Sequence, residues 1–222
     1  MNLLVTDLHG TLIANNERAL VESTNYSLEK HGKKERVDMD FCKKYLGRPW
    51  ALFFKTRCPD SSKKEIENMV ETAKKEGLKL YPKYIKPMDN AIEVLSEIKR
   101  RGDIVVAMSS TTYEAFDGYL NAIGIRKLID HKIGIRREHE NDDSFDVVGY
   151  KANEIKKFKN GKNFDKKAVV GDSELDVEVG IITGLSTFFF SKEGRKLGKA
   201  DYSISDLREL LPFFYEDYKI EL

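Results

Sequence analysis

Short, unbroken apolar runs alternate along this chain with longer segments of helical periodicity, and this alternation limits the folds it can adopt. The clearest runs cover residues 2–6, 104–108, 168–170 and 185–190, and a weaker one covers 128–135. A brief continuous apolar run bounded by turn-forming residues is typical of a strand that is buried on both faces. The pattern predicts an α/β, Rossmann-like core of three layers, in which helices cover both faces of a parallel sheet.

Helical patterns separate these runs in the second half of the chain. They predict helices over 89–101, 112–123, 151–160 and 176–184, and a closing helix over 203–214. The polar segment 136–150 predicts a mobile loop. No internal repeat or low-complexity tract interrupts this order.

Between about residues 15 and 80 the chain has helical patterns and no strand signal. Apolar residues recur every four positions over 37–45, which indicates a helix. Ser62 and Glu65 have the spacing of a capping box and predict the start of another helix, which Gly77 is expected to end. We therefore expect a helical cap domain at 14–87, inserted into an α/β core made of 1–13 and 88–222.

Composition excludes several classes of protein. The 222 residues suit one or two domains, and the net charge of +1 gives no indication of nucleic-acid or anionic-membrane binding. Two cysteines, Cys42 and Cys58, in a chain without a signal peptide predict a reduced, cytoplasmic protein. No apolar run approaches the roughly 20 residues that a membrane helix needs.

Small polar and acidic residues follow three of the predicted strands. Asp7 ends the first, Ser109 and Ser110 end the second, and Asp172 follows the third, with Asp176 four residues later. Ligands of open parallel sheets bind beyond the carboxyl ends of the strands, where these residues are expected to meet. Clustered carboxylates need a cation, and oxygen ligands suit Mg²⁺. A single acid at a strand end is ordinarily a turn residue or helix cap, so the prediction depends on the three strand ends together.

A lysine lies between the second and third strand ends in the sequence. Lys151 opens the predicted helix over 151–160 and could offset the charge of an anionic intermediate. Lys156 and Lys157 are alternatives, although both lie deeper in that helix.

These segments resemble the four motifs of the haloacid dehalogenase-like hydrolase superfamily: "DLHGTL", "VVAMSST", Lys151 and "VVGDSELD". The resemblance covers nearly the whole chain. "KPMDNAIEVLSEIKRRG" resembles the segment that leads into the second motif, and "ADYSISDLREL" resembles the usual closing segment. The helical insertion lies where the phosphatase-like branch of the superfamily carries its cap.

The resemblance implies a nucleophile and a metal site. Asp7 would attack phosphorus and form an aspartyl-phosphate, a case of carboxylate covalent catalysis. Mg²⁺ would be held by the Asp7 carboxylate, the backbone carbonyl of His9 and Asp172, with Asp176 as a ligand or as a support for the ligands.

The resemblance also implies substrate contacts. Ser109 would hydrogen-bond a phosphoryl oxygen, although Ser110 remains an alternative, and Lys151 would stabilise the phosphoryl charge. Thr11 would help to fix the loop after the nucleophile, and Gly10 would allow its tight turn.

The chain departs from the resemblance at His9, where phosphatases of the superfamily usually carry a second aspartate for proton transfer. Imidazole could replace it as acid and base, with an ordinary pKa of about 6.5. Otherwise the protein would be an impaired or transfer-only enzyme, or would bind a phosphorylated ligand without turnover. A metal-independent 2-haloacid dehalogenase is a further alternative, against which the intact "GDSELD" argues. His9 could also be a space-filling residue.

Substrate choice is expected to depend on the cap. Arg48 could reach a distal anionic group of the substrate or be a solvated surface residue. Aromatic residues Trp50, Phe53 and Phe54 are expected to pack the cap core, and the roles of Tyr81 and Tyr84 near the hinge stay open.

Together these features predict a Mg²⁺-dependent phosphatase that acts on a small phosphorylated metabolite. We expect a monomer or homodimer, without nucleic-acid or membrane partners.

Overall fold

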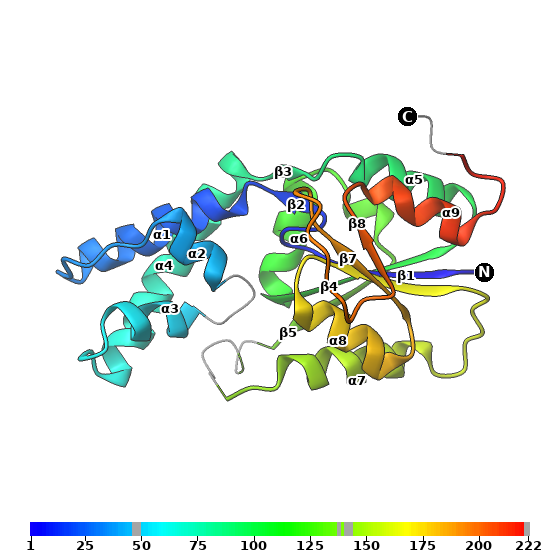
Figure 1. Cartoon of the computed structure of the whole chain (residues 1–222). Coiled ribbons are helices and arrows are strands. Elements are labelled where there is room, and N and C mark those ends of the chain that lie inside the picture. The colour runs from blue at the N-terminus through cyan, green and yellow to red at the C-terminus, as the bar shows by residue number, and fades with distance from the viewer. Residues whose placement is uncertain (46–49, 137–138, 140–143, 220–222) are drawn as a thin grey trace.

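A six-stranded parallel sheet forms the centre of the protein in this computed structural model, which describes residues 1–45, 50–136, 139 and 144–219 (Figure 1). The strand order is β5-β4-β1-β6-β7-β8. The strands are β1 (Leu3–Asp7), β4 (Ile104–Thr112), β5 (His131–Ile135), β6 (Lys167–Gly171), β7 (Ser186–Phe190) and β8 (Tyr202–Ile204). Every neighbouring pair is parallel, which confirms the predicted α/β class.

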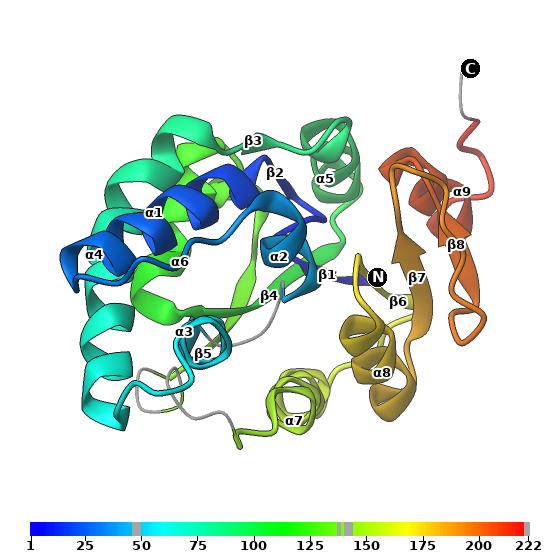
Figure 2. The same cartoon turned by 60° about the vertical axis from the view of Figure 1, so that its left-hand side comes forward.

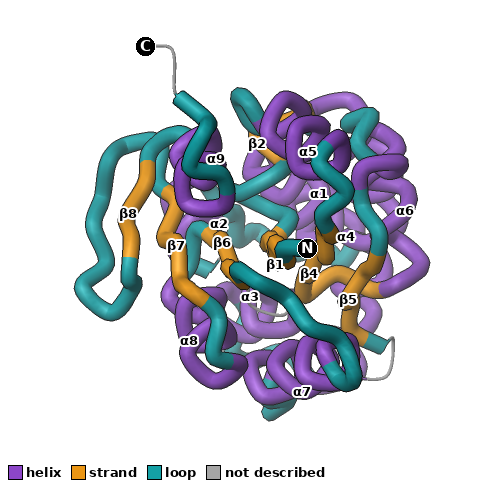
Figure 3. Tube along the Cα trace, turned by 90° about the vertical axis from the view of Figure 1, so that its right-hand side faces the viewer, coloured by secondary structure: helices purple, strands orange, loops and turns teal. Residues whose placement is uncertain are grey.

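Helices cover both faces of this sheet, as Figure 3 shows along the strands. On one face lie α5 (Ala91–Arg100), α6 (Tyr113–Ala122) and α9 (Leu210–Phe214), and on the other lie α7 (Val147–Lys159) and α8 (Glu174–Thr183). Successive side chains of a strand point to opposite faces. Leu4 accordingly packs in the cluster with α5, α6 and α9, while Leu3 and Val5 pack in the cluster with α7 and α8. Burial on both faces explains why the strands read as continuous apolar runs.

In the described part of the chain, the cap consists of the four helices between β1 and α5. They are α1 (Asn16–Lys30), α2 (Met39–Lys44), α3 (Trp50–Arg57) and α4 (Lys63–Tyr84), and α1 runs beside α4 (Figure 2). Two short antiparallel strands, β2 (Ile13–Ala14) and β3 (Lys86–Pro87), pair where the chain enters and leaves these helices. No sequence pattern predicts this ribbon, because two-residue strands carry no periodicity.

Phe53 and Phe54 lie fully inside the cap, in a cluster with residues of α1, α2 and α4. The cap-core prediction for these two rings is therefore confirmed. Trp50 is half-buried and contacts this cluster as well as the main core. Both cysteines are buried there as free thiols.

Helix α4 continues seven residues beyond Gly77, so the predicted end of this helix is wrong. Gly77 serves close packing instead. A Cβ at this position would lie 3.1 Å from the Trp50 ring and 3.3 Å from the Tyr81 ring. The predicted start at Ser62 is confirmed, because its side chain and that of Glu65 form both bonds of a capping box.

Two other predicted elements differ from the structure. The helix expected over 151–160 begins at Val147, because the Asp146 side chain caps it by accepting the Gly149 N–H. The segment 203–214 is not one helix. It starts within β8, which pairs with β7, then forms a 3₁₀ turn (Leu207–Glu209) and the short helix α9. Of the predicted loop 136–150, residues 137, 138 and 140–143 lie outside the described part.

No helix in the described part of the chain combines the length and the apolar character that a membrane crossing requires.

A buried carboxylate fixes the start of the two central strands. Asp103 accepts the Asn2 backbone N–H at 2.6 Å and the Asn2 side-chain amide at 2.9 Å. The buried Tyr215 hydroxyl donates to the same carboxylate at 2.7 Å. These bonds tie the segments before β1 and β4 to the end of the chain, and thereby support the register that places Asp7 beside Met108.

Tyr215→Phe is expected to lower the free energy of unfolding by about 1–2 kcal/mol, because it removes a hydrogen bond to a buried carboxylate. Urea denaturation followed by circular dichroism measures the change. Tyr202→Phe, at an exposed ring of β8, is the control and should cost less than about 0.5 kcal/mol. Equal losses in both variants would contradict the anchoring role of Tyr215.

Candidate active site

The carboxyl ends of β1 and β6 bring three acids together. Asp7 ends β1, and the register pairs Thr6 with Val170, so that Asp172 follows one residue beyond the end of β6. Asp176 lies in the first turn of α8. Carboxylate oxygens of Asp7, Asp172 and Asp176 all lie within 4.8 Å of one another. The strand-end convergence that the sequence predicted is therefore present.

Local backbone geometry explains why these acids can approach so closely. Ser173 caps α8: its hydroxyl donates to the Asp176 carboxylate at 2.5 Å, and its own N–H donates to the same oxygen at 3.3 Å. These bonds turn the Asp176 side chain back toward the strand end. A Cβ at Gly171 would overlap Asp176, and a Cβ at Gly10 would overlap Asp172. Gly10 also has φ of 85°, which other residues rarely adopt.

Lys151 provides the positive charge of the cluster. Its ammonium lies 3.5 Å from Asp7 and 3.6 Å from Asp176, and its side chain is buried. It occupies the second turn of α7 rather than opening the helix, because the helix starts earlier than predicted. Lys156 and Lys157 are exposed, and Lys157 pairs with Glu154 at 2.6 Å. The geometry therefore favours Lys151 among the three candidates.

Burial and mutual repulsion dominate the electrostatics of the acids. Loss of hydration, followed by the charge of Asp176, raises the pKa of Asp7 well above its ordinary value. The same two causes raise the pKa of Asp172 to about 7. Burial acts to lower the pKa of Lys151, but Asp176 and Asp7 more than offset it and the net pKa is raised. One ammonium cannot balance three ionised carboxylates, so the acids retain protons at higher pH than free aspartates do.

This donor set fits a divalent cation. Three carboxylates at one point match the oxygen ligands that Mg²⁺ takes, and their repulsion is what a cation relieves. Bonds of about 2.1 Å to Mg²⁺ place opposite ligands about 4.2 Å apart. The three carboxylate oxygens all lie within 4.8 Å of one another, so modest side-chain movements would let the three acids share one ion.

His9 lies in the loop after Asp7 and contacts the carboxyl-terminal half of β4. Its Nδ1 is 3.3 Å from the Ser109 hydroxyl, which also accepts the Thr111 N–H at 3.1 Å. Loss of hydration and the charge of Lys151 lower the pKa of His9 to about 4. The imidazole is therefore neutral at pH 7.

The remaining predicted site residues are placed as follows. Thr11 is fully buried, and its hydroxyl has no hydrogen-bond partner in the described part of the chain. Backbone bonds close the loop around it, from Leu12 and Ile13 to the Leu8 carbonyl at 3.0 and 2.8 Å. Ser110 is half-buried in β4 beside Ser109. Arg48 lies outside the described residues.

Sequence reasoning did not identify Ser173 or the aromatic neighbours of His9. Ser173 stands three residues before Asp176, which is the capping-box spacing and could have been recognised. Tyr119 and Tyr81 approach His9 from distant segments, with ring centroids 5.3 and 6.2 Å from the imidazole. No local pattern signals such a contact.

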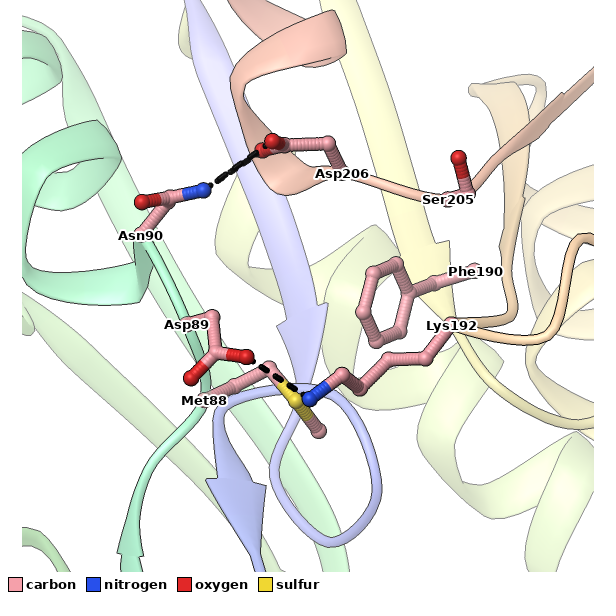
Figure 4. A pocket seen from close by; sticks show the side chains of 7 residues that line it. All are labelled: Met88, Asp89, Asn90, Phe190, Lys192, Ser205 and Asp206. Carbon is pink, nitrogen blue, oxygen red and sulfur yellow. Dashed lines mark hydrogen bonds and ion pairs between the residues drawn. The ribbon is translucent and has the colours of Figure 1, made fainter.

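A separate small pocket of about 160 Å³ lies between the start of α5 and the ends of β7 and β8 (Figure 4). Its polar side chains pair with one another: Lys192 with Asp89 at 2.7 Å, and Asn90 with Asp206 at 3.0 Å. Its lining in the described structure includes none of the predicted catalytic residues: Met88, Asp89, Asn90, Phe190, Lys192, Ser205 and Asp206. The carboxylate cluster is therefore the stronger candidate site.

The sequence profile described as haloacid dehalogenase-like hydrolase matches residues 4–190. The chain belongs to this family. This chain is also 27% identical over 215 residues to a protein of Caldanaerobacter subterraneus named "Putative pyrophosphatase PpaX". The matched region covers 92% of this chain and 90% of that protein.

Solved structures of this family share the fold. A haloacid dehalogenase-like hydrolase from Streptococcus pneumoniae superposes with a TM-score of 0.76 at 16% identity, covering 97% of this chain and 99% of the other. The structure of a predicted phosphatase from Clostridium acetobutylicum superposes with a TM-score of 0.71 at 21% identity, covering 94% of this chain and 95% of the other. At these identities the likeness shows the fold, including the inserted helical cap.

At pH 8, above the Asp172 pKa of about 7, Asp172→Asn is expected to raise the melting temperature of the metal-free protein, because it removes one of three clustered like charges without changing side-chain shape. It should also abolish the rise in melting temperature that Mg²⁺ gives the unsubstituted protein through binding to the folded state. Differential scanning fluorimetry with EDTA and with Mg²⁺ measures both effects. Glu174→Gln, at an exposed acid two residues away, is the control that keeps the Mg²⁺ response.

Proposed function

We propose that this protein is a Mg²⁺-dependent phosphatase that hydrolyses a small phosphate monoester through an aspartyl-phosphate on Asp7. The observation that carries the proposal is the meeting of Asp7, Asp172, Asp176 and Lys151 at one edge of the sheet. A bound Mg²⁺ would be held by these carboxylates and the His9 carbonyl, and would neutralise charge on the phosphoryl group.

The proposed reaction has two displacements at phosphorus. An Asp7 carboxylate oxygen attacks the phosphorus, the bond to the leaving oxygen breaks, and that oxygen takes a proton. Water then attacks the aspartyl-phosphate, gives up a proton, and releases inorganic phosphate with the Asp7 carboxylate restored. Lys151 is close enough to Asp7 to offset the charge of a phosphoryl group there. Ser109, Ser110 and Thr11 are proposed to hydrogen-bond the phosphoryl oxygens. The Thr11 hydroxyl has no partner in the described structure but is fully buried, so the loop would have to shift for it to reach a phosphoryl oxygen.

The cap is proposed to select the substrate and exclude water during the reaction. A small phosphorylated metabolite fits this arrangement. Because one similar protein is named as a pyrophosphatase, inorganic pyrophosphate belongs in a substrate panel beside phosphate monoesters.

Purified protein is expected to release phosphate from a panel of phosphate monoesters with Mg²⁺, and to lose this activity in EDTA. Asp7→Asn should lower the rate by at least about 10³-fold, because the amide lacks the nucleophilic oxygen anion. Glu174→Gln is again the control. Saturable binding of one phosphate compound without turnover would instead support a binding protein, and halide release from a 2-haloacid without metal would support the dehalogenase alternative.

We further propose that His9 takes the place of the usual acid/base aspartate: its ring gives a proton to the leaving oxygen and later accepts one from the attacking water. The negative charge of the bound phosphate compound would raise the pKa of the imidazole for the first of these steps. His9→Ala is then expected to lower kcat for an aryl phosphate by about 10²-fold or more, the usual contribution of a positioned proton-transfer group. Steady-state kinetics at saturating substrate measures this. Unchanged or higher activity would remove His9 from the mechanism. A large gain in turnover in His9→Asp would indicate that the natural enzyme is impaired in hydrolysis or specialised for transfer.

A further inference from the structure

Three elements that are distant in the sequence meet at the His9 ring. Ser109 from β4 lies 3.3 Å from Nδ1. The Tyr119 ring from α6 and the Tyr81 ring from α4 approach at centroid distances of 5.3 and 6.2 Å, with interplanar angles of 81° and 79°. Such near-perpendicular pairs have the edge-to-face geometry that aromatic rings prefer. Tyr81 and Tyr119 also contact each other at 5.0 Å, so that the two rings form one wall beside the imidazole.

Tyr81 is the member of this group that belongs to the cap. It lies in the last turn of α4 and is 7% exposed, in the same buried cluster as Leu8 and Leu12 of the loop that carries His9. Helix α4 packs against α6 of the core, so this turn joins the cap to the catalytic loop (Figure 2). Tyr81 occupies this position because α4 continues past Gly77.

We propose that Tyr81 is a positioning residue that fixes the orientation of the His9 imidazole when the cap is docked on the core. Ser109 and Tyr119 hold the ring from the core, and Tyr81 adds the contact that depends on the cap. The cap thereby sets the direction in which the ring nitrogens point, in addition to covering the substrate. This inference rests on the proposed function of His9, whereas the contact itself can be tested without activity.

The contact is tested first by nuclear magnetic resonance on the full-length protein. Four histidines give a small set of ring signals, and the set missing in His9→Gln identifies those of His9. Tyr81→Leu, which removes the ring and keeps an apolar side chain, should move the His9 signals toward the values of a free histidine. Tyr81→Phe should leave them in place, and so should Tyr84→Leu, which removes another tyrosine ring from the same last turn of α4. Unchanged His9 signals in Tyr81→Leu would overturn the proposal.

Kinetics then tests the consequence for catalysis. Tyr81→Leu is expected to lower kcat for an aryl phosphate about tenfold with less than about a twofold change in KM, because a misdirected catalytic group slows the chemical step more than binding. Tyr81→Phe should restore kcat, and Tyr84→Leu should retain it. In a His9→Ala background, Tyr81→Leu should have almost no further effect, since its role acts through His9. An equal loss of kcat in both backgrounds would show a general effect on the cap and overturn the proposal.

The two experiments separate this inference from the proposed function. If the unsubstituted protein hydrolyses no phosphate compound, the phosphatase proposal fails, and the positioning role in catalysis fails with it. The His9 signals still decide whether Tyr81 orients the ring. If hydrolysis occurs and depends on His9 but not on Tyr81, the proposed function stands and the present inference is wrong.

Discussion

Three carboxylates and one ammonium group share a buried edge of the sheet, and the remaining structure keeps them there. Moving charged groups out of water is costly unless they are paired and hydrogen-bonded. Lys151 lies 3.5 Å from Asp7 and 3.6 Å from Asp176, and Ser173 donates to the Asp176 carboxylate through its hydroxyl and its N–H. Apolar packing on both faces of the sheet offsets the free-energy cost of removing these charges from water, with Leu4 packed on one face and Val5 on the other. Repulsion among ionised carboxylates at this point is what a bound cation would relieve.

The cap is connected to this site through the two chain segments that enter and leave it, and also through side-chain packing. Its own core around Phe53 and Phe54 makes it a packed unit, while the end of α4 joins the main core through Tyr81. A helix that ended at Gly77 would leave Tyr81 outside this contact. The glycine lets Trp50 and Tyr81 lie against the helix, so the same residue that looked like a stop signal supports the continuation.

His9 stands at the position where the phosphatases that this chain resembles usually carry a second aspartate. A carboxylate at this position would be held by hydrogen bonds, whereas an imidazole can also be oriented by aromatic rings. The His9 ring contacts Ser109 of β4, Tyr119 of α6 and Tyr81 of the cap. Its orientation therefore depends on both the core and the cap.

The sequence by itself determined the parallel α/β class, the order of the elements and the strand-end positions of Asp7 and Asp172, because continuous apolar runs and the residues that end them are local features. It also gave the start of α4, since a capping box spans only four residues. It misplaced the start of α7, the end of α4 and the strand β8, because these depend on packing and on pairing with β7. Only the tertiary structure decided that Lys151 rather than Lys156 or Lys157 faces the acids, and that Tyr81 meets His9. Contacts between residues far apart in the chain leave no periodic or spacing signal, because their geometry exists only once the sheet and the cap have packed together.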